Sequence, residues 1–548
     1  MRSHSLVRRV RILAIATSVI ATSVSAFGQS GRSSLMASAR AAAQTVSAQP
    51  GESLRRLSID EASALALEQN LGIRIQRYDP QIQDTGIALA RSAWAPQLSS
   101  TLTKNSSDQP VTSILSGTIP VVTTGQFLTA VSLAATAPWG ASYSVSTNNN
   151  RFTTTDPTST FNPRLSSNLS LNFTQPLLRN FEIDQIRQQV QTSKKVRDLS
   201  DIQLQTVVSQ TVRNVKNAYW DLVYAINNFK AQQQSLSLSQ QSLKDNQKRV
   251  EIGTLAPIDI VQSQAEVANN EQGVIVADAQ IKQAQDNLRA LILDPGTPDF
   301  WTVVFDPTDA ATYSEQAIDI DAAVRTALDK RTDLAAAKNT IEQSDINIKF
   351  YGNQIKPDLN AVVNYGAIGI GGTQFSGGTN PITGQTTPLT IVNRSYGTAL
   401  GDVFSSAYPQ WSFGVTIGYP LGANTAHANL ARVRLEYEQS QAQLKALQLQ
   451  VATAVRTVGR SVQTNQKRVQ AAKASRELQE KKLEAEEKKL AAGMSSTFLV
   501  LQAQRDLALA RTQEVQAVSD YNKSLVDFDA VQQVPLGASA ASFVTVAR

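Results

Sequence analysis

The sequence predicts an α+β membrane protein that combines long coiled-coil α-helices with an antiparallel transmembrane β-barrel. Three observations predict this fold: an internal duplication, apolar residues spaced by seven over very long stretches, and strands with one apolar and one polar face. The chain offers two strand pairs, whereas the smallest outer-membrane barrels have eight strands. We therefore expect copies of the chain to assemble, which leaves no open sheet edge in lipid.

The internal duplication appears in two registers. Gly253 and the residues up to Glu266 carry the same pattern as Gly493 and the residues up to Asp506, 240 positions later. The segment from Ile59 to Leu98 likewise shares its landmarks with the segment that begins 261 positions later. Repeats this long are duplicated domains. The predicted organisation is a signal peptide (1–26), a flexible tether (27–52), a first repeat (53–292), a connecting segment (293–319), a second repeat (320–530) and a C-terminal tail (531–548).

The first 26 residues are typical of a secretory signal peptide. Four arginines precede the apolar run Ile12–Ile20 and the small-residue cleavage site Val24-Ser-Ala26. The segment holds four arginines and no acidic residue, so without it the net charge falls from +6 to +2 and does not indicate a nucleic-acid partner. The alternative is a buried helix in a cytosolic protein. The absence of cysteine excludes a disulfide scaffold and a lipidated N-terminal cysteine.

The first repeat begins with a helical pattern from Ile59 to Ala93, which Pro96 ends. A polar region over about 97–175 follows, and its last segment alternates between two faces. The apolar face of that strand holds Leu165, Leu169, Leu171 and Phe173. A shorter alternation over Leu98–Thr103 supplies a second strand. A further hairpin around Phe127–Thr147, turning at Pro138-Trp-Gly140, is an alternative, and the sequence leaves open whether it enters the membrane.

The second repeat has the matching strand pair. One strand carries Trp411, Phe413, Val415, Ile417 and Tyr419 on its apolar face, and a shorter alternation covers Leu359–Tyr365. The intervening segment, about 366–405, is rich in Gly, Thr and Asn and is predicted to be an extracellular loop. Its glycines at 366, 369, 371 and 372 do not fit a phosphate-binding motif and are predicted to be loop glycines. Long polar loops on one side of a sheet suit an outer-membrane barrel; the alternative is a β-sandwich.

Each strand pair leads into a very long helix, predicted over 183–252 and 426–492. Apolar residues recur every seven positions, at 215, 222, 229, 236, 243 and 250, and largely at the equivalents 455, 462, 469, 476, 483 and 490. Such a spacing predicts helices packed side by side with a left-handed supercoil. Each long helix breaks at its glycine, Gly253 or Gly493, and returns as a second helix with the same period. No 18-residue apolar stretch follows the signal, so membrane insertion would use strands.

Catalytic and metal-binding constellations are absent from the sequence. The only histidines are His4, within the predicted signal, and His427, so no His-based triad or multi-histidine metal site forms within one mature chain. The Lys/Glu cluster over 480–489 has opposite charges four residues apart and predicts a solvated helix face. We expect a protein that is not an enzyme and that needs no cofactor or metal.

Three sequence features together resemble the TolC-like outer-membrane efflux proteins. They are the segment Phe173–Arg179, the paired glycines Gly253 and Gly493, and Gly418-Tyr-Pro-Leu421 before the second long helix. The resemblance covers nearly all of residues 53–530. It implies a homotrimer in outer-membrane lipid, with a 12-stranded barrel to which each protomer gives four strands, and a periplasmic helical tunnel closed at its inner end. It also implies docking to a periplasmic adaptor protein and an inner-membrane transporter.

The resemblance places adaptor docking and the entrance gate at the two tips, 249–259 and 489–502. The implied docking residues are Arg249, Gly253, Thr254, Leu255, Lys489, Gly493, Met494 and Ser495. The implied gate residues are Asp259, Leu490, Ser495, Leu499 and Gln502. Asp259 matches an acidic residue of the family's entrance. Ser495 and Leu490 stand where a basic and an aromatic partner are expected, and Leu499 and Gln502 replace two expected carboxylates, so the salt-linked latch and the acidic ring are predicted to be missing.

The function that these features imply is an outer-membrane exit duct of a tripartite efflux or type I secretion system. The alternative is a periplasmic structural or adaptor-like coiled-coil protein without a membrane barrel. The amphipathic strand pairs in both repeats argue against the alternative, because an adaptor carries a single hairpin between soluble β-domains. Membrane fractionation would separate the two.

Overall fold

The computed structural model describes residues 53–111, 120–309, 313–379, 384, 386–419 and 424–533. The predicted signal peptide and tether, most of the predicted C-terminal tail, and Pro420 and Leu421 of the motif before the second long helix lie outside these residues. Two units divide the chain by contacts. The small unit holds Pro298–Phe305 and the described residues 53–55. It includes parts of the paired strands β1 (Ser53–Leu57) and β6 (Val303–Pro307). The large unit holds the remaining elements.

The predicted helix over 59–93 is three helices in sequence: α3 (Ile59–Gln69), α4 (Leu71–Gln76) and α5 (Tyr78–Ser92). The first break falls at Asn70, whose extended backbone ends α3 and whose side chain accepts a hydrogen bond from the amide of Ile73 to cap α4. Asparagine is a favoured helix cap for this reason. Periodicity alone did not reveal the break, because Asn70 also fits a polar position of one continuous helix.

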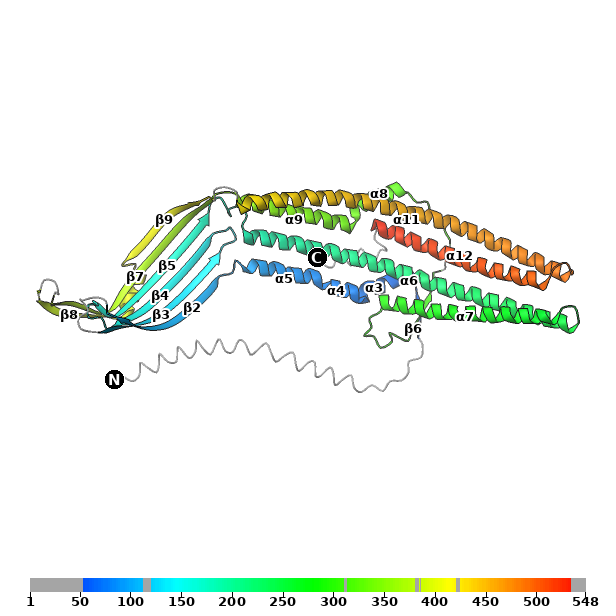
Figure 1. The fold of residues 1–548 in the computed structure, drawn as a ribbon, viewed down its shortest axis with the longest axis horizontal. Coiled ribbons are helices and arrows are strands. Elements are labelled where there is room, and N and C mark those ends of the chain that lie inside the picture. Colours follow the sequence, from blue (N-terminus) through cyan, green and yellow to red (C-terminus); the bar gives the residue numbers. More distant parts are fainter. Residues whose placement is uncertain are drawn as a thin grey trace, which may run out of the picture. The chain divides into compact units, whose positions relative to one another are not determined.

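The sheet of the large unit has seven strands, more than the two pairs predicted. They are β2 (Gln97–Pro110), β3 (Val121–Thr136), β4 (Ser142–Thr154), β5 (Phe161–Pro176), β7 (Asp358–Thr379), β8 (Thr386–Arg394) and β9 (Pro409–Gly418). All pairs are antiparallel, in the order β2-β3-β4-β5-β7, with β8 and β9 both against the far edge of β7. β9 pairs with the first half of β7 and β8 with its last third (Figure 1). The prediction of two strand pairs in the chain is therefore wrong, whereas the number of strands that each copy gives to a barrel stays a prediction.

The hairpin that the sequence left as an alternative is present as β3 and β4. The turn between them follows the predicted Pro138-Trp-Gly140, where Gly140 has a φ of 94°. The amide of Gly140 donates to the carbonyl of Ala137 at 2.8 Å, and the amide of Ala137 donates to the carbonyl of Ala141 at 2.7 Å. β3 and β4 lie between β2 and β5 along their whole length, so this hairpin is part of the sheet and not an appendage.

The predicted extracellular loop over 366–405 is largely ordered secondary structure, and its glycines at 366, 369, 371 and 372 lie within β7. Helix α10 (Tyr396–Phe404) packs on β7 and β5. A Cβ atom at Gly369 would lie 1.8 Å from the carbonyl oxygen of Ala399, so only glycine lets α10 lie this close to the strand. The loop prediction was wrong because these glycines allow close backbone contacts with α10 and with neighbouring strands, whereas by composition alone they resemble the glycines of a loop.

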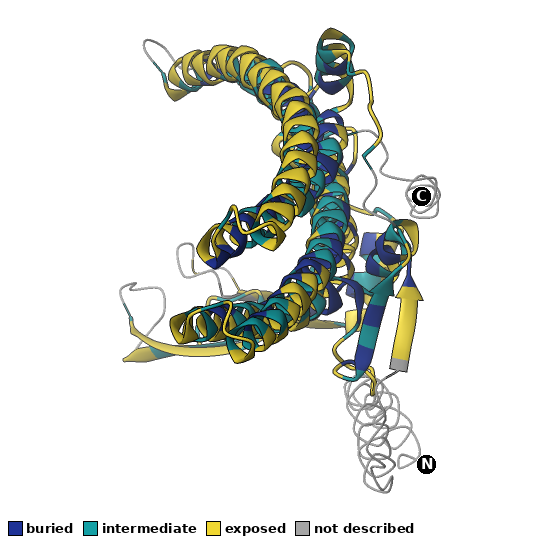
Figure 2. Ribbon diagram, turned by 90° about the vertical axis from the view of Figure 1, so that its right-hand side faces the viewer, coloured by how far each residue is buried: buried dark blue, intermediate teal, exposed yellow. Residues whose placement is uncertain are grey.

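Two helical hairpins contain the four longest helices of the large unit. α6 (Gln185–Glu251) returns as α7 (Pro257–Ile292), and α11 (Thr425–Ala491) returns as α12 (Thr497–Gln532). The bounds of both long helices lie within two residues of those predicted. Contacts place these helices in the order α7, α6, α12, α11, and Figure 2 shows them as one curved layer. None of the helices within the described ranges is both long and apolar enough to cross a membrane.

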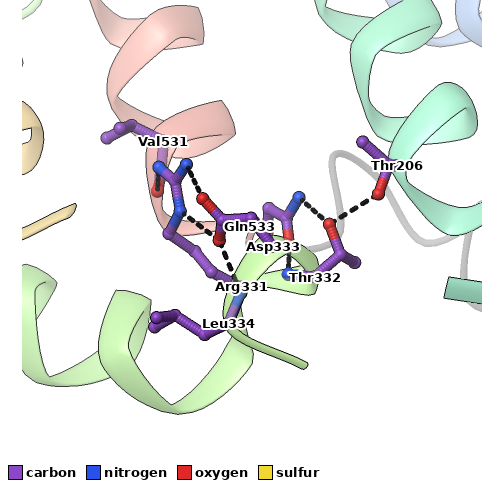
Figure 3. A network of polar contacts seen from close by, with 7 residues as sticks. All are labelled: Thr206, Arg331, Thr332, Asp333, Leu334, Val531 and Gln533. Carbon is purple, nitrogen blue, oxygen red and sulfur yellow. Dashed lines mark hydrogen bonds and ion pairs between the residues drawn. The ribbon is translucent and has the colours of Figure 1, made fainter. Parts of the chain in front are cut away.

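The second repeat enters its strands through α8 (Ile320–Lys330) and α9 (Thr332–Gln354), and the break between these helices anchors the end of α12 (Figure 3). Arg331 donates to the carbonyl of Val531 at 3.2 Å, and the amide of Thr332 donates to the side chain of Gln533 at 2.6 Å. The hydroxyl of Thr206 on α6 donates to that of Thr332 at 2.7 Å. The junction therefore ties α9, α12 and α6 together, so both repeats share one helical layer.

Candidate functional site

The tip of the first hairpin is a turn closed by a left-handed glycine. Gly253 has a φ of 76°. The amide of Thr254 donates to the carbonyl of Arg249 at 2.8 Å, and the amide of Gly253 donates to that of Val250 at 3.0 Å. These two bonds satisfy carbonyls that the end of an α-helix leaves without partners. Pro257 then opens α7, where its missing N–H costs nothing.

The tip of the second hairpin repeats this backbone structure. Gly493 has a φ of 72°, the amide of Met494 donates to the carbonyl of Lys489 at 2.8 Å, and the amide of Gly493 donates to that of Leu490 at 3.2 Å. A Cβ atom added at either tip glycine would meet no heavy atom within 4 Å. The requirement for glycine therefore comes from the left-handed backbone and not from crowding. The prediction that Gly253 and Gly493 make the turns is confirmed.

The side chains behind the two turns differ. At the second tip the hydroxyl of Ser495 donates to one oxygen of Glu486 at 2.8 Å, and the Nζ atom of Lys489 lies 2.7 Å from the other. The hydrogen bond from Lys489, with that from Ser495, holds the pKa of Glu486 below its ordinary value. At the first tip the hydroxyl of Thr254 donates to the carbonyl of Arg249 at 2.9 Å, so this link is neutral. Of these two described turns, only the second has an ion pair, between Lys489 and Glu486, behind it.

The structure separates the residues that the resemblance grouped as a gate. Asp259 is half-buried on α7, and Leu499 and Gln502 are exposed on α12. Leu490 packs against an apolar cluster inside its own hairpin. Ser495 is bonded to Glu486, and no hydrogen bond or ion pair among the described residues joins Ser495 to Asp259.

Exposed apolar side chains surround both tips, and sequence reasoning missed most of them. Ile252 and Met494 are 74% and 75% exposed, and Ile258, Val261 and Phe498 also face outward. Ile258 and Phe498 occupy equivalent positions, 240 residues apart. Contiguous exposed apolar surface marks an interaction site more often than an isolated side chain does. The signal that would have found these residues is their failure to follow the seven-residue spacing of the seam.

The Lys/Glu cluster over 480–489 is only partly the solvated face predicted. Lys488 pairs with Glu484 on the helix surface, as expected. Two other members of the cluster reach across to α12: Glu480 accepts a hydrogen bond from Arg511 at 3.1 Å, and Lys482 lies 2.8 Å from Asp506. The periodicity of α11 could not indicate these contacts, because the partners lie on another helix.

The sheet forms the second candidate site because strands β2, β3, β4, β5, β7 and β9 share an apolar face toward the helices; further along, Lys104 and Arg151 flank Phe127 on this face. Directly opposed residues lie on the same face of a sheet. One row across the apolar face consists of Leu98, Leu133, Val145, Leu171, Tyr365 and Trp411. The adjacent row on the other face begins Ser99, Ser132, Ser146 and Ser170. All six side chains of the apolar row except Tyr365 are among the exposed large hydrophobic residues of the chain. A sheet with such an exposed apolar face suits contact with lipid.

Comparison with known proteins places this architecture. The family model for outer membrane efflux proteins matches residues 62–292 and 323–531, together more than half of the chain. The Campylobacter jejuni CmeC outer membrane channel is similar in structure, with a TM-score of 0.60 at 13% identity over 89% of each chain. The Vibrio cholerae outer membrane protein VceC (TM-score 0.58, 15% identity, 86% of this chain and 95% of that one) shares the fold.

The open-state MtrE outer membrane channel of Neisseria gonorrhoeae is a third such structure, with a TM-score of 0.57 at 16% identity over 86% of this chain and 88% of that one. At these identities the likeness concerns the fold alone. None of the curated proteins is a significant match to the sequence.

Proposed function

Because the chain belongs to the outer membrane efflux protein family, we propose that it is the outer-membrane exit duct of a tripartite efflux or type I secretion system. In this role it passes small molecules or proteins from an inner-membrane transporter to the exterior. The main observation behind the proposal is that one chain contains both an amphipathic sheet and the four long helices α6, α7, α11 and α12. The sheet suits a membrane wall, and the helices suit a tunnel through the periplasm.

The duct forms when three copies close both walls. The open sheet edges of one chain are β2 on one side and β9 with β8 on the other. A backbone edge without partners is too costly in lipid to stay open. β2 runs away from the helices and β9 runs toward them, so β9 of one copy can pair with β2 of the next in the antiparallel sense. The curvature of the helical layer supports closure of the helices in the same ring (Figure 2).

The helical tips are the proposed docking surface for a periplasmic adaptor protein. The docking residues are those that the resemblance implies at Arg249–Leu255 and Lys489–Ser495, together with the exposed apolar side chains Ile258 and Phe498. Two equivalent tips per chain offer a trimer six similar sites. The exposed apolar area at each tip would be covered on binding, and this burial would contribute most of the affinity.

The entrance gate lies at the same end of the helices in this proposal. Asp259 would supply its charge, with Leu499 and Gln502 lining the constriction from α12. Ser495 has a neutral hydroxyl, which cannot form an ion pair with Asp259 and which is bonded to Glu486 within its own hairpin, so the proposed gate has no salt-linked latch at this position.

Membrane insertion tests the proposal with a matched pair of substitutions on β5. Phe173 lies on the apolar face and Asn172 on the polar face of the same strand. Phe173→Arg should reduce assembly in the outer membrane, because an arginine facing lipid costs from about 1 kcal/mol near the interface to about 2–4 kcal/mol at mid-membrane in each copy, and Phe173 lies toward the helical end of β5. Asn172→Arg should assemble normally, since its side chain faces the lumen.

The measurement is the amount of detergent-resistant oligomer in the outer-membrane fraction. Equal amounts from both variants would place β5 outside the bilayer. Recovery of the parent chain from the soluble periplasm would instead favour the periplasmic structural or adaptor-like protein.

A further inference from the structure

We infer that each chain contributes six strands to the membrane wall, so that three copies close an 18-stranded barrel with an exit as wide as the helical tunnel. The inference rests on the proposed function and concerns the hairpin β3–β4. Among the strands β2, β3, β4, β5, β7 and β9, four adjoin a helix of the helical layer: β2 follows α5, β5 precedes α6, β7 follows α9 and β9 precedes α11. Of these six described strands, only β3 and β4, joined by their turn at Ala137–Ala141, lack such a helix.

The hairpin β3–β4 lies at the same level as the neighbouring strands β2 and β5 of the proposed membrane wall. β2 pairs with β3 over Gln97–Pro110, and β4 pairs with β5 from Ser142 to Phe152 without a bulge. The turn of the hairpin meets the start of α6: a Cβ atom at Gly140 would lie 2.8 Å from the side chain of Arg187. The near ends of β3 and β4 therefore stop where the helices begin, level with the other strands.

Toward the helices the hairpin also has the two faces of a membrane strand, whereas further along Arg151 lies opposite Phe127 on the apolar side. Leu133 and Val145 continue the apolar row between Leu98 and Leu171. On the opposite face the hydroxyls of Ser146 and Ser170 lie 2.7 Å apart, and those of Ser99 and Ser132 are equally close. A hairpin outside the bilayer would have no need to keep this alternation in register with its neighbours.

Strand direction permits closure with six strands. Each neighbour in the series β2, β3, β4, β5, β7 and β9 is antiparallel, so the first and last strands run in opposite directions. An even number of strands per chain lets every seam between copies remain antiparallel. Bacterial single-chain outer-membrane barrels likewise have even strand numbers.

The circumferences of the two walls agree. Three copies of the four helices α5, α6, α9 and α11, which lie side by side in that order, give 12 helices. At interaxial distances of 8–10 Å these span about 100–120 Å. Eighteen strands about 4.8 Å apart, tilted by about 40°, span about 110 Å, whereas 12 strands at this tilt span about 75 Å. The extra hairpin thus removes a narrowing at the junction, and barrel diameter rises about 1.5-fold.

Cysteine labelling tests the position of the hairpin, because the chain has no cysteine of its own. The test pair is Val145→Cys and Ser146→Cys on β4, and the reference pair is Leu171→Cys and Ser170→Cys on β5. A membrane-impermeant maleimide should label both serine positions several-fold faster than their apolar neighbours in trimers reconstituted into nanodiscs. Equal labelling of positions 145 and 146, with the contrast at 170 and 171 intact, would place the hairpin outside the wall and overturn the inference. Loss of contrast at both pairs would overturn the proposed barrel itself.

Strand number gives a second test through deletion of residues 111–154. The deletion joins Pro110 to Thr155 and leaves the native segment 155–160 between β2 and β5. In the resulting register Leu98 opposes Phe173 and Leu102 opposes Leu169, so the apolar faces still match. Cross-sections of cryo-EM maps should count six strands per copy for the full chain and four for the deletion variant. Four per copy in the full chain would overturn the inference.

Discussion

The two helical hairpins share one turn but hold their helices together with different side chains. Toward the second tip the seam is apolar: Leu483, Val500, Ala503 and Leu507 form a buried cluster. The equivalents of Val500 and Leu507 in the first hairpin, Ile260 and Val267, are only half-buried.

The buried positions toward the first tip are polar instead: Ser235, Ser239, Asn246 and Ser263. The amide of Asn246 donates to the hydroxyl of Ser263 at 2.8 Å. A neutral hydrogen bond contributes about 1 kcal/mol net, less than a fully buried leucine. The two hairpins thus share the backbone turn but differ in the side-chain interactions that hold their helices together.

A second difference lies further from the tips, within the seven-residue columns themselves. The second hairpin has Arg476 and Glu514 at two positions where apolar residues are expected, and these two side chains form an ion pair at 2.6 Å. The equivalent residues of the first hairpin are Leu236 and Val274. Two interruptions of the pattern therefore compensate each other.

The largest expected effect separates the two seams. Leu507→Ala should destabilise the α11–α12 tip by about 2–5 kcal/mol, because it leaves a cavity in a buried cluster. Val267→Ala, at the equivalent position of the first hairpin, should cost about 1 kcal/mol or less, since that side chain is half-buried.

Hydrogen exchange of the tip peptides in the assembled protein measures both effects as local opening. Equal acceleration of exchange in the two hairpins would mean that assembly buries the seams alike and that the difference belongs to the single chain.

The ion pair offers the next largest effect. Arg476→Leu leaves Glu514 without its partner in the seam and should cost about 1–3 kcal/mol; the value lies below that for a fully buried pair because a quarter of each side chain is exposed. The double variant Arg476→Leu/Glu514→Val installs the residues of the first hairpin and should recover most of the loss.

Thermal unfolding of the oligomer and exchange in the middle of α11 and α12 check this prediction. A double variant no more stable than Arg476→Leu would contradict the prediction, and the loss would then come from the contact of Arg476 with Glu480, which both variants lack.

The tip turns should respond alike, which sharpens the comparison. Gly253→Ala and Gly493→Ala each force a side chain onto a left-handed backbone, at a cost of about 1 kcal/mol, and neither meets a neighbour. The bulkier Gly253→Val and Gly493→Val should abolish export while the oligomer remains in the membrane.

Dye efflux, together with the amount of oligomer in the membrane, measures the two outcomes separately. Normal efflux in both valine variants would remove the tips from the mechanism.

The long helices and their tips followed from the sequence because their signals are local. Seven-residue spacing determined the bounds of α6 and α11, and glycine marked each turn. The ion pair between Arg476 and Glu514 did not follow, although each residue was visible as an interruption. Nothing in a seven-residue column says which residue of another helix lies opposite. The same reason hid the contact between Glu486 and Ser495, which spans a turn.

The strands were harder to predict than the helices. β5 and β9 alternate cleanly, but much of β7 is built from glycine and alanine, whose small side chains carry little alternation. Two of its glycines, Gly369 and Gly371, are explained by the approach of α10, and Gly372 by its positive φ and the close approach of β5. The hairpin β3–β4 was visible as an alternative, and its register against β2 and β5 came from the structure.

The smallest expected effect concerns the entrance charge, which the two hairpins also divide unequally. Asp259 of the first hairpin has Leu499 as its equivalent in the second, so the proposed trimer would carry three carboxylates at this level rather than six. Multivalent cations bind where several like charges converge in a narrow, poorly hydrated ring. Trivalent cation in the low micromolar range, added from the periplasmic side, should leave the conductance in planar bilayers nearly unchanged, and Asp259→Ala should raise conductance only modestly.

Leu499→Asp supplies the matched gain of function. Leu499 is exposed, so the substitution adds three carboxylates without opening a core and should make the channel sensitive to the same cation. A sharp block of the parent channel that disappears in Asp259→Ala would contradict the expectation. It would mean that three carboxylates on the first hairpin suffice for an acidic ring, and that the second hairpin contributes shape to the entrance but no charge.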